Sequence, residues 1–579
     1  MKLAAGFPST TRDDWRRLAL AVLRKSGVEA ATPEEALASV TYDGVTVQPL
    51  YDAGDLPQSA RRETRTATGW DVRQRHAVAD PEAVLADLEN GVTSLWLVAG
   101  DGAIPVEELP GVLKDVYLDL VPITLEAGAR TAEAAGALLA LAAAQGVTPS
   151  GNLGAPAGEP VAAELAARCV AEFPQLRAVT VDATPYHDAG GGDAEELGCS
   201  IALGVAGLRT LTGGGLTAEQ AFGQLDFRYA ATDDQFATVA KLRAARKLWA
   251  RVAEVCGVRS PQRQHVVTSS AMMTARDPWV NMLRTTLACF AAGVGGADAV
   301  TVQPFDAALR TPDAFSRRIA RNTQSLLLEE AGAGRVIDPA GGSWYVERRT
   351  ADLAERAWAW FQEIEAAGGV EAAAELVSAR VAATRARRAD DIAHRRLPIT
   401  GVSEFPDIDE KPLRVQPAAA GQDAVGAVVD PATFPGGPGI RYAREFEELR
   451  DLADAQPERP KVFLATIGPV AAHTARAAFA ANLFQAGGLA TETAGPGTDP
   501  EQIATAFAIS GAAVACLCSS DRLYGEHAQA VAAALKRSGA RRVWLAGKGT
   551  YESVDGCLFA GCDALDVLRT TFRDLEVTR

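Results

Sequence analysis

Short apolar runs alternate with longer alanine-rich stretches along most of the chain, and this pattern predicts strands that alternate with helices. Within residues 46–389 the apolar runs predict strands at Ser94–Val98, Val121–Leu125, Ala178–Asp182, His265–Thr268 and Ala297–Gln303. The stretches between and after them predict helices at Arg130–Gln145, Glu159–Phe173, Thr217–Phe222, Asp233–Cys256, Asp313–Glu330 and Ala351–Ala367. The repeated order predicts a (β/α)8 TIM barrel, with an open doubly wound sheet as the main alternative.

Residues 459–579 repeat the alternation on a smaller scale. Apolar runs at Lys461–Ile467, Ala512–Leu517 and Arg542–Ala546 predict strands, and Ala471–Phe484 predicts the helix after the first of them. This order predicts a small doubly wound α/β domain, which would place a ligand at the loop after its first strand.

Two segments lie outside these domains. Residues 1–45 contain the charged helical stretch Arg12–Lys25 and are too short to bury a core of their own, so we expect an arm. Residues 390–458 are rich in Pro, Gly and Ala and poor in aromatic residues, which is typical of a linker.

Composition narrows the class of protein. The chain has 579 residues, of which 48% are hydrophobic and 22% charged, as in a globular protein of two or three domains. Its net charge of −16 argues against nucleic-acid binding. The eight cysteines form no CxxC pair, so we expect no structural zinc site, no disulfide framework and no metal site. No apolar run or N-terminal leader predicts membrane insertion or secretion, and we expect a cytoplasmic protein.

The clearest candidate for chemistry is the pair Tyr186 and His187, which follows the strand Ala178–Asp182. Catalytic groups of a TIM barrel lie at the carboxyl ends of its strands, where a histidine could exchange a proton with a substrate carbonyl. The alternative is a solvated loop histidine.

Other motifs are weaker. His265 is interpreted as a strand-edge residue, and Asn152-Leu153-Gly154 either approaches a phosphate or forms a tight turn. Three further histidines lie in charged surroundings and are predicted at the surface: His76, His394 and His527. No GxSxG, HExxH or Walker motif is present.

Ordered sequence blocks carry a resemblance to a known family. They read VTVQPLYDAGDLP near the start, VTVDATPYHDAGG in the middle, then MMTARDPWVNMLRTTLACFAAGVGGADAVTVQPFDAAL and, over Asp313–Glu347, DAFSRRIARNTQSLLLEEAGAGRVIDPAGGSWYVE. These blocks resemble methylmalonyl-CoA mutase. The resemblance implies a barrel that threads a coenzyme A ester, followed by a flavodoxin-like domain that binds adenosylcobalamin and supports the radical interconversion of methylmalonyl-CoA and succinyl-CoA.

The resemblance also indicates a degenerate cofactor site. In the family the cobalamin loop reads DxHxxG, and its histidine is the lower cobalt ligand. One frame of the matching stretch places His473 at the histidine, with Ala471 at the aspartate and Arg476 at the glycine. A frame shifted by one places Val470 at the aspartate and Ala472 at the histidine, and either frame loses the aspartate and the glycine. Ser519 and Gly547 stand in damaged versions of the two later signatures, so none of these residues is expected to bind the cofactor.

The barrel shows similar losses. The family's FDLPTHRGYDSD and TIQND stretches have no intact counterpart, although Tyr186 and His187 match its YH pair, whose histidine contacts the substrate thioester. We interpret this pair as vestigial, with no active catalytic residue in the chain.

Some members of the family are heterodimers of a working and a non-working chain. The sequence resembles the non-working, small (β) subunit, so we expect a large (α) subunit as partner, with adenosylcobalamin on that partner and acyl-CoA bound by the complex. The N-terminal arm would wrap the partner. Two alternatives remain at this point: a self-sufficient acyl-CoA mutase that ligates cobalt through His473, and a CoA-ester-binding interaction protein.

Overall fold

The barrel is a closed ring of parallel strands. The computed structural model describes the chain except residues 1–9, 58–68, 311, 412, 414–438 and 578–579. The strands neighbour one another in the order β10-β3-β4-β5-β6-β7-β8-β9, and each pairing is parallel. Their bounds are β3 Asp71–His76, β4 Ser94–Val98, β5 Ile123–Glu126, β6 Gly151–Pro156, β7 Leu176–Asp182, β8 Leu225–Ala231, β9 Arg263–Thr268 and β10 Ala299–Thr301. The predicted barrel is confirmed, and the open sheet is excluded for this domain.

Three strands of the barrel were absent from the sequence-based assignment, and each has a physical reason. β3 and β8 carry arginines and other polar residues that face the barrel interior, so their apolar pattern is weak. β6 contains glycines and was interpreted as a turn or a phosphate-binding stretch. A Cβ at Gly151 would lie 2.0 Å from the carbonyl oxygen of Ile123, and Gly151 has φ +122°. The glycine is there because the backbones of β5 and β6 approach closely, and the turn interpretation is wrong.

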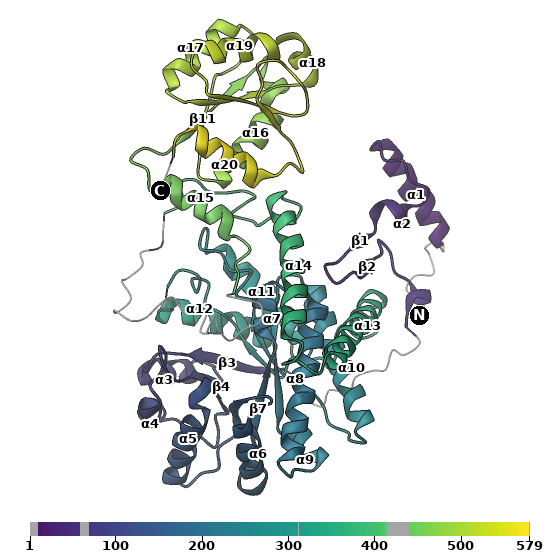
Figure 1. The fold of residues 1–579 in the computed structure, drawn as a ribbon, viewed down its shortest axis with the longest axis vertical. Coiled ribbons are helices and arrows are strands. Elements are labelled where there is room, and N and C mark those ends of the chain that lie inside the picture. The colour runs from purple at the N-terminus through teal and green to yellow at the C-terminus, as the bar shows by residue number, and fades with distance from the viewer. Residues whose placement is uncertain (1–9, 58–68, 311, 412, 414–438, 578–579) are drawn as a thin grey trace.

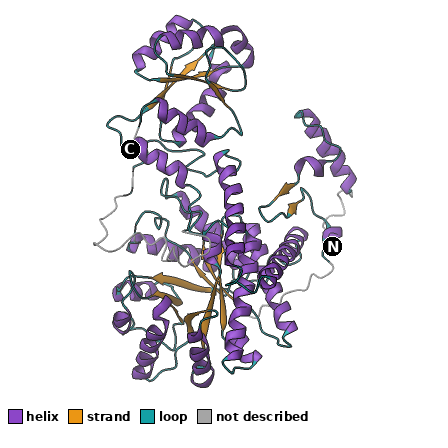
Figure 2. Cartoon of the chain, viewed as in Figure 1, coloured by secondary structure: helices purple, strands orange, loops and turns teal. Residues whose placement is uncertain are grey.

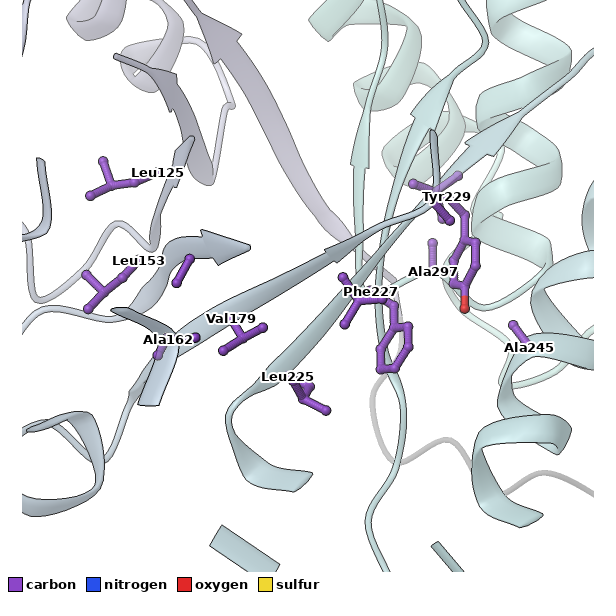
Figure 3. Close-up of a cluster of buried hydrophobic side chains, with 14 of the residues drawn as sticks. Leu125, Leu153, Ala162, Val179, Leu225, Phe227, Tyr229, Ala245 and Ala297 are labelled. Atoms are coloured by element: carbon purple, nitrogen blue, oxygen red, sulfur yellow. The ribbon is translucent and has the colours of Figure 1, made fainter. Parts of the chain in front are cut away.

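Helices surround the ring, as Figures 1 and 2 show. They are α3 Pro81–Glu89, α4 Leu109–Val112, α5 Thr131–Gln145, α6 Pro160–Glu172, α7 Thr184–Asp188, α8 Asp193–Gly213, α9 Ala218–Gly223, α10 Gln235–Val255, α11 Val280–Val294, α12 Ala314–Ser325, α13 Trp344–Ala366 and α14 Ala374–Ala393, with short turns of helix at Val106–Glu108, Gly128–Arg130 and Leu326–Glu330. Alternate strand residues face these helices and form the main apolar core, part of which is drawn in Figure 3. The residues between them face the barrel axis.

The C-terminal domain is a five-stranded parallel sheet in the order β12-β11-β13-β14-β15. The strands are β11 Lys461–Thr466, β12 Ala490–Thr493, β13 Val514–Cys518, β14 Arg542–Ala546 and β15 Gly556–Leu558. Its helices are α16 Val470–Ala486, α17 Pro500–Ser510, α18 Asp521–Leu523, α19 Gln529–Arg537 and α20 Ala564–Asp574, with a π-turn at Tyr524–Ala528. In chain order this is the flavodoxin-like arrangement 2-1-3-4-5, and the predicted fold of the domain is confirmed. Separate apolar clusters cover the two faces of the sheet.

Helices α14 and α15 (Arg444–Asp454) lie between the two domains, and the N-terminal elements extend from the barrel. Helix α15 lies within residues 390–458, which the composition marks as linker, yet its Phe446 is fully buried in the core of the C-terminal domain. Figure 1 shows α14 and α15 between the barrel and the C-terminal sheet, with the N-terminal elements projecting to the side. Those elements are α1 Arg12–Lys25, α2 Pro33–Leu37, β1 Ser39–Val40, β2 Thr46–Val47 and a turn at Ala53–Asp55. No residue of α1 is buried. Among the described residues, no helix combines the length and apolar character that a membrane span needs.

Candidate functional site

A cavity of about 660 Å³ opens at the carboxyl ends of the barrel strands. The segment Gly439–Arg444, which leads into α15, lines the side of the cavity away from the barrel. This segment is fixed by its backbone, because Ile440 N donates to Asp188 O at 2.7 Å and Tyr442 N donates to Ala271 O at 2.9 Å. The cavity is therefore bordered by the barrel mouth and by the chain that leads to the C-terminal domain.

Arg228 of β8 lies at the centre of the barrel mouth and is 2% exposed. Its Nη1 donates to Glu126 at 2.5 Å and to Asp182 at 2.7 Å. Burial opposes the charge, but these two carboxylates raise the pKa of Arg228 above its ordinary value. The guanidinium also lies 4.1 Å from the ring centroid of Trp96, and its Nε donates to His265 Nδ1 at 3.3 Å. Charged and aromatic side chains thus occupy the barrel axis at this level.

Polar pairs also fill the next level of the interior. Arg73 of β3 is buried and donates to Ser94 at 3.1 Å, while Asn152 of β6 donates to Asp226 at 3.1 Å. A ligand that threads the barrel along its axis would have to displace these side chains as well as Arg228.

Tyr186 and His187 lie in α7, at the end of β7 as predicted, but neither lines the cavity. His187 is 3% exposed, and its Nε2 lies 2.6 Å from Ser269 Oγ. Burial, with Lys241 and Arg388, lowers the pKa of His187 to about 3, so its ring is neutral at pH 7. Ser269 lines the cavity. The hydroxyl of Ser269, and not the imidazole, is therefore the group offered to a bound molecule, and the interpretation of His187 as a solvated loop residue is wrong.

A buried ion cluster supports His187 from behind. Lys241 is fully buried and contacts Glu196 at 2.6 Å and Asp193 at 3.1 Å. The Glu196 carboxylate lies 4.0 Å from His187 Nδ1, and burial raises the pKa of Glu196 to about 7. Ser269, His187 and Glu196 lie side by side in the order of a catalytic triad. However, the Glu196 carboxylate is hydrogen-bonded to Lys241 and to Ala230 N, and it lies too far from the His187 ring for a hydrogen bond. The arrangement packs the helices and does not form a nucleophile triad.

Two histidines lie elsewhere than the sequence predicts. His76 was expected at the surface, but it is 5% exposed at the end of β3, with Nε2 3.3 Å from Asp87 Oδ2. That prediction fails because Asp87 and Arg321 form an ion pair beneath the ring, and neither partner is evident from the neighbouring sequence. His265 is 4% exposed within the barrel, and its Nε2 lies 2.8 Å from Thr301 Oγ1. The remaining histidines of the charged segments are partly exposed: His394 and His527.

In the C-terminal domain, His473 occupies the second turn of α16, after β11. It is 9% exposed, and neither ring nitrogen makes a hydrogen bond to a described residue. Burial lowers the pKa of His473. Position 471 is alanine, so no carboxylate from the aligned position of the loop orients the ring, as a metal-bound imidazole requires.

Tyr524 covers the carboxyl ends of β13 and β14, which lie beside this loop. Its hydroxyl lies 3.0 Å from Leu517 O and 2.8 Å from Ala546 O, two acceptors for its single proton, and the oxygen accepts from Ser519 N at 2.8 Å. Tyr524 is 1% exposed, and its ring packs 5.0 Å from the guanidinium of Arg476. One side chain therefore satisfies backbone groups at the ends of both β13 and β14.

The other two positions compared with the family's cofactor signatures, Ser519 and Gly547, also make contacts within the domain. Ser519 is fully buried, and its Oγ donates to Ile467 O at 2.7 Å. A Cβ at Gly547 would lie 2.8 Å from Arg476 Nη1, so the guanidinium takes the room beside this glycine. Arg476 is held there by Asp521 at 2.6 Å, and Lys548 lies over the ring of Phe559. These residues do not fit cobalamin, because the loop lacks the orienting acid and side chains fill the strand edge where the fold places a ligand.

No group of three or more His, Cys, Asp or Glu side chains in the described part of the chain has the arrangement of a metal site. The geometry thus gives one cavity at the barrel mouth and, in the C-terminal domain, a loop whose residues do not fit cobalamin.

Comparison with known proteins identifies the family. The family model for methylmalonyl-CoA mutase matches residues 156–427. The methylmalonyl-CoA mutase small subunit of Streptomyces virginiae is 55% identical over 100% of this chain and 98% of its own length. The chain belongs to the methylmalonyl-CoA mutase family, and within it to the small subunits. The small subunit of Propionibacterium freudenreichii subsp. shermanii is 38% identical over 100% of this chain, and the large subunit of the same organism is 36% identical over 44% of it. The mutase is an isomerase, and this chain aligns in full with the subunit named small.

Sequence reasoning did not identify the residues that close the two sites. Tyr524 follows the signature around Ser519 by five positions, and only the folded turn brings it beneath the strand ends. Arg228 lies in a strand that the pattern did not predict. The signal that could have located it is the segment LDFRYAA, in which Asp226 and Arg228 are the only charged residues, because a buried arginine requires an acid as partner.

Proposed function

We propose that this chain is the non-catalytic small subunit of a heterodimeric methylmalonyl-CoA mutase, and that it supports a large subunit which carries adenosylcobalamin and interconverts methylmalonyl-CoA and succinyl-CoA. The observation that carries the proposal is the closure of the cofactor edge by Tyr524 and Arg476. A chain with this edge depends on its partner for the cofactor.

The barrel interior supports the same role. The ion pairs of Arg228 cross the axis along which an acyl-CoA would pass, and His187 is separated from the cavity by Ser269. The vestigial thioester donor therefore has no substrate position in front of it. The acyl-CoA is expected on the large subunit, in the cytoplasm.

The N-terminal arm supports the presence of a partner. Residues 42–44 anchor it to the body, since Tyr42 OH donates to Asp391 at 2.8 Å and Ala194 N donates to Asp43 at 2.8 Å. Beyond this anchor, Leu18 and Val22 of α1 are 60% and 64% exposed. They lie four residues apart on one helix face, and exposed apolar faces of this kind are typical of interaction surfaces.

The cofactor assignment is tested with the purified full chain. It is incubated with adenosylcobalamin in the dark, desalted, and its visible absorbance is recorded beside that of the large subunit. We expect this chain to emerge colourless and without mutase turnover, and the large subunit to retain the corrin. Turnover by the isolated chain would refute the proposal.

His473→Ala separates the subunit role from the self-sufficient alternative. The reconstituted heterodimer should keep its full activity with this variant, because His473 is not a cobalt ligand in the proposal. A loss of activity beyond fivefold, with intact heterodimer by size exclusion, would favour ligation through His473.

A further inference from the structure

The run of three glycines at residues 190–192, between α7 and α8, is packed too tightly for side chains. A Cβ at Gly190 would lie 3.0 Å from Ile440 Cδ1, and Gly190 has φ +102°. A Cβ at Gly192 would lie 2.5 Å from Asp43 Oδ1. The run therefore touches the segment that borders the cavity (residues 439–444) at one end and the N-terminal arm at the other.

The arm meets the body of the protein at the tip of its hairpin. β1 and β2 are joined by residues 41–45, whose turn is closed by the hydrogen bond from Gly44 N to Thr41 O at 2.9 Å. Three helices of the barrel domain hold this tip. The bonds are from Ala194 N of α8 to Asp43 at 2.8 Å, from Arg356 of α13 to Gly44 O at 3.2 Å, and from Arg387 of α14 to Tyr42 O at 2.7 Å.

Arg388 of α14 contacts both the hairpin tip and residues 439–444. It is 8% exposed, and its guanidinium carbon lies 4.6 Å from the ring centroid of Tyr42 and 5.2 Å from that of Tyr442. Its Nη1 donates to Gly190 O at 2.6 Å. One buried cation therefore binds a ring of the arm, a ring of the segment beside the cavity and the glycine run that touches both.

Residues 439–444 connect the two domains. The ring of Tyr442 packs against the apolar cores of both the barrel and the C-terminal domain. The segment is bound to the barrel by the hydrogen bonds of Ile440 N to Asp188 O and of Tyr442 N to Ala271 O. Opening of the segment from the barrel has to break these two bonds, so the exchange of the two amides reports the opening.

The outer part of the arm is linked to both ends of the hairpin. Arg12 of α1 pairs with Asp52 at 3.2 Å and donates to Leu50 O at 3.1 Å, and both of these residues follow β2. Arg16 of α1 pairs with Glu34 of α2, which precedes β1, at 2.8 Å. A displacement of α1 is therefore transmitted to the hairpin and to its tip.

We propose that Arg388 couples the arm to residues 439–444, so that displacing the hairpin tip loosens the connection between the barrel and the C-terminal domain. Removal of the Tyr42 ring would admit water to one face of the guanidinium, and its contact with Tyr442 would weaken. Whatever binds or moves the arm would thereby act on the closure of the segment beside the cavity. This coupling goes beyond the subunit role and is tested on the isolated chain, so it can fail while the proposed function holds.

The test is amide hydrogen exchange of the full chain, read by mass spectrometry of peptides that cover residues 439–444. Tyr42→Leu should speed the exchange of the Ile440 and Tyr442 amides about fivefold or more, as expected for the loss of a buried cation–π contact. The amides of β13, inside the C-terminal domain, should keep their rates. The matched control is Tyr51→Leu, which removes a tyrosine of the arm whose ring contacts Tyr345 of α13, 5.2 Å between centroids, and should leave residues 439–444 unchanged.

Two further variants test whether the effect passes through Arg388. Coupling between two sites acts equally in both directions, so Tyr442→Leu should speed the exchange of the Ala194 amide, which donates to Asp43. Arg388→Met removes the shared cation and keeps a side chain of similar length. In that background, Tyr42→Leu should have no further effect on residues 439–444.

Other results would overturn the inference. It is wrong if Tyr42→Leu leaves the Ile440 and Tyr442 amides at wild-type rates, or if the amides of β13 accelerate by the same factor. It is also wrong if Tyr51→Leu has an equal effect, or if the effects of Tyr42→Leu and Arg388→Met simply multiply. Should Tyr42→Leu not fold, an unchanged Ala194 amide in Tyr442→Leu contradicts the coupling as well.

Discussion

Replacing Arg228 by methionine removes the cation from the centre of the barrel and keeps a side chain of similar length. The two carboxylates it binds, Glu126 and Asp182, would then lose the cation that contacts both of them. Removal of one partner from a buried ion pair costs about 3–5 kcal/mol of folding free energy. The carboxylate side chains are 31% and 30% accessible from the cavity, and water there can screen part of their charge. We therefore expect the barrel to lose about 2–4 kcal/mol.

The measurement is urea unfolding followed by tryptophan fluorescence, with the barrel transition analysed separately because two domains need not unfold together. Arg168→Met is the control, since its exposed pair with Glu172 should contribute less than about 1 kcal/mol. The triple variant that adds Glu126→Gln and Asp182→Asn to Arg228→Met should recover at least half of the loss, because no uncompensated charge remains. A loss below about 1 kcal/mol, or a triple variant no more stable than the single one, would refute this account of the barrel interior.

Four further predictions concern the other sites. Leu18→Glu in α1 should prevent copurification with the large subunit, whereas Arg24→Glu on the same exposed helix should not; equal recovery of both variants would exclude this face as the contact. Tyr524→Phe should lower the unfolding free energy of the C-terminal domain by about 1–3 kcal/mol in urea titrations, because buried strand-end groups lose their partner; an unchanged midpoint would contradict that role. Gly198→Ala should destabilise the barrel by about 1–3 kcal/mol, since the new Cβ would lie 2.4 Å from Trp360 Cδ1, and a thermal midpoint equal to that of the wild type would show that α8 and α13 can separate freely. Asp188→Asn should be more stable than the wild type at pH 8, by a larger margin than at pH 5.

The sign of the Asp188 effect follows from its raised pKa. The folded chain holds a proton on Asp188 up to about pH 7, whereas the unfolded chain releases it near pH 4. Between these values the folded state binds more protons, so its stability falls as the pH rises, and the penalty is complete above pH 7. Asparagine carries no such penalty. A difference between variant and wild type that is the same at pH 5 and pH 8, measured from urea midpoints, would show that Asp188 ionises normally.

The alternation of apolar and alanine-rich segments was sufficient to predict both domains, because most strands are covered on both faces and read as apolar runs. It failed where a strand serves the barrel interior. The arginines of β3 and β8 have their partners on other strands, and β6 is built on glycines that only the neighbouring backbone requires. The site shows the same dependence on partners that are distant in sequence. Tyr186 and His187 were placed correctly at the end of a strand, but whether His187 or Ser269 faces the cavity depends on how α7 packs against the end of β9.

The hydroxyl of Tyr524 also bears on how the proposed heterodimer would be assembled. It occupies carbonyl groups at the strand ends where the fold places a ligand, so we expect this domain to fold without an external molecule. We expect cells starved of the vitamin to accumulate this chain in its native form, ready to receive newly made large subunits. Its thermal transition should then be identical whether the growth medium contains the vitamin or not.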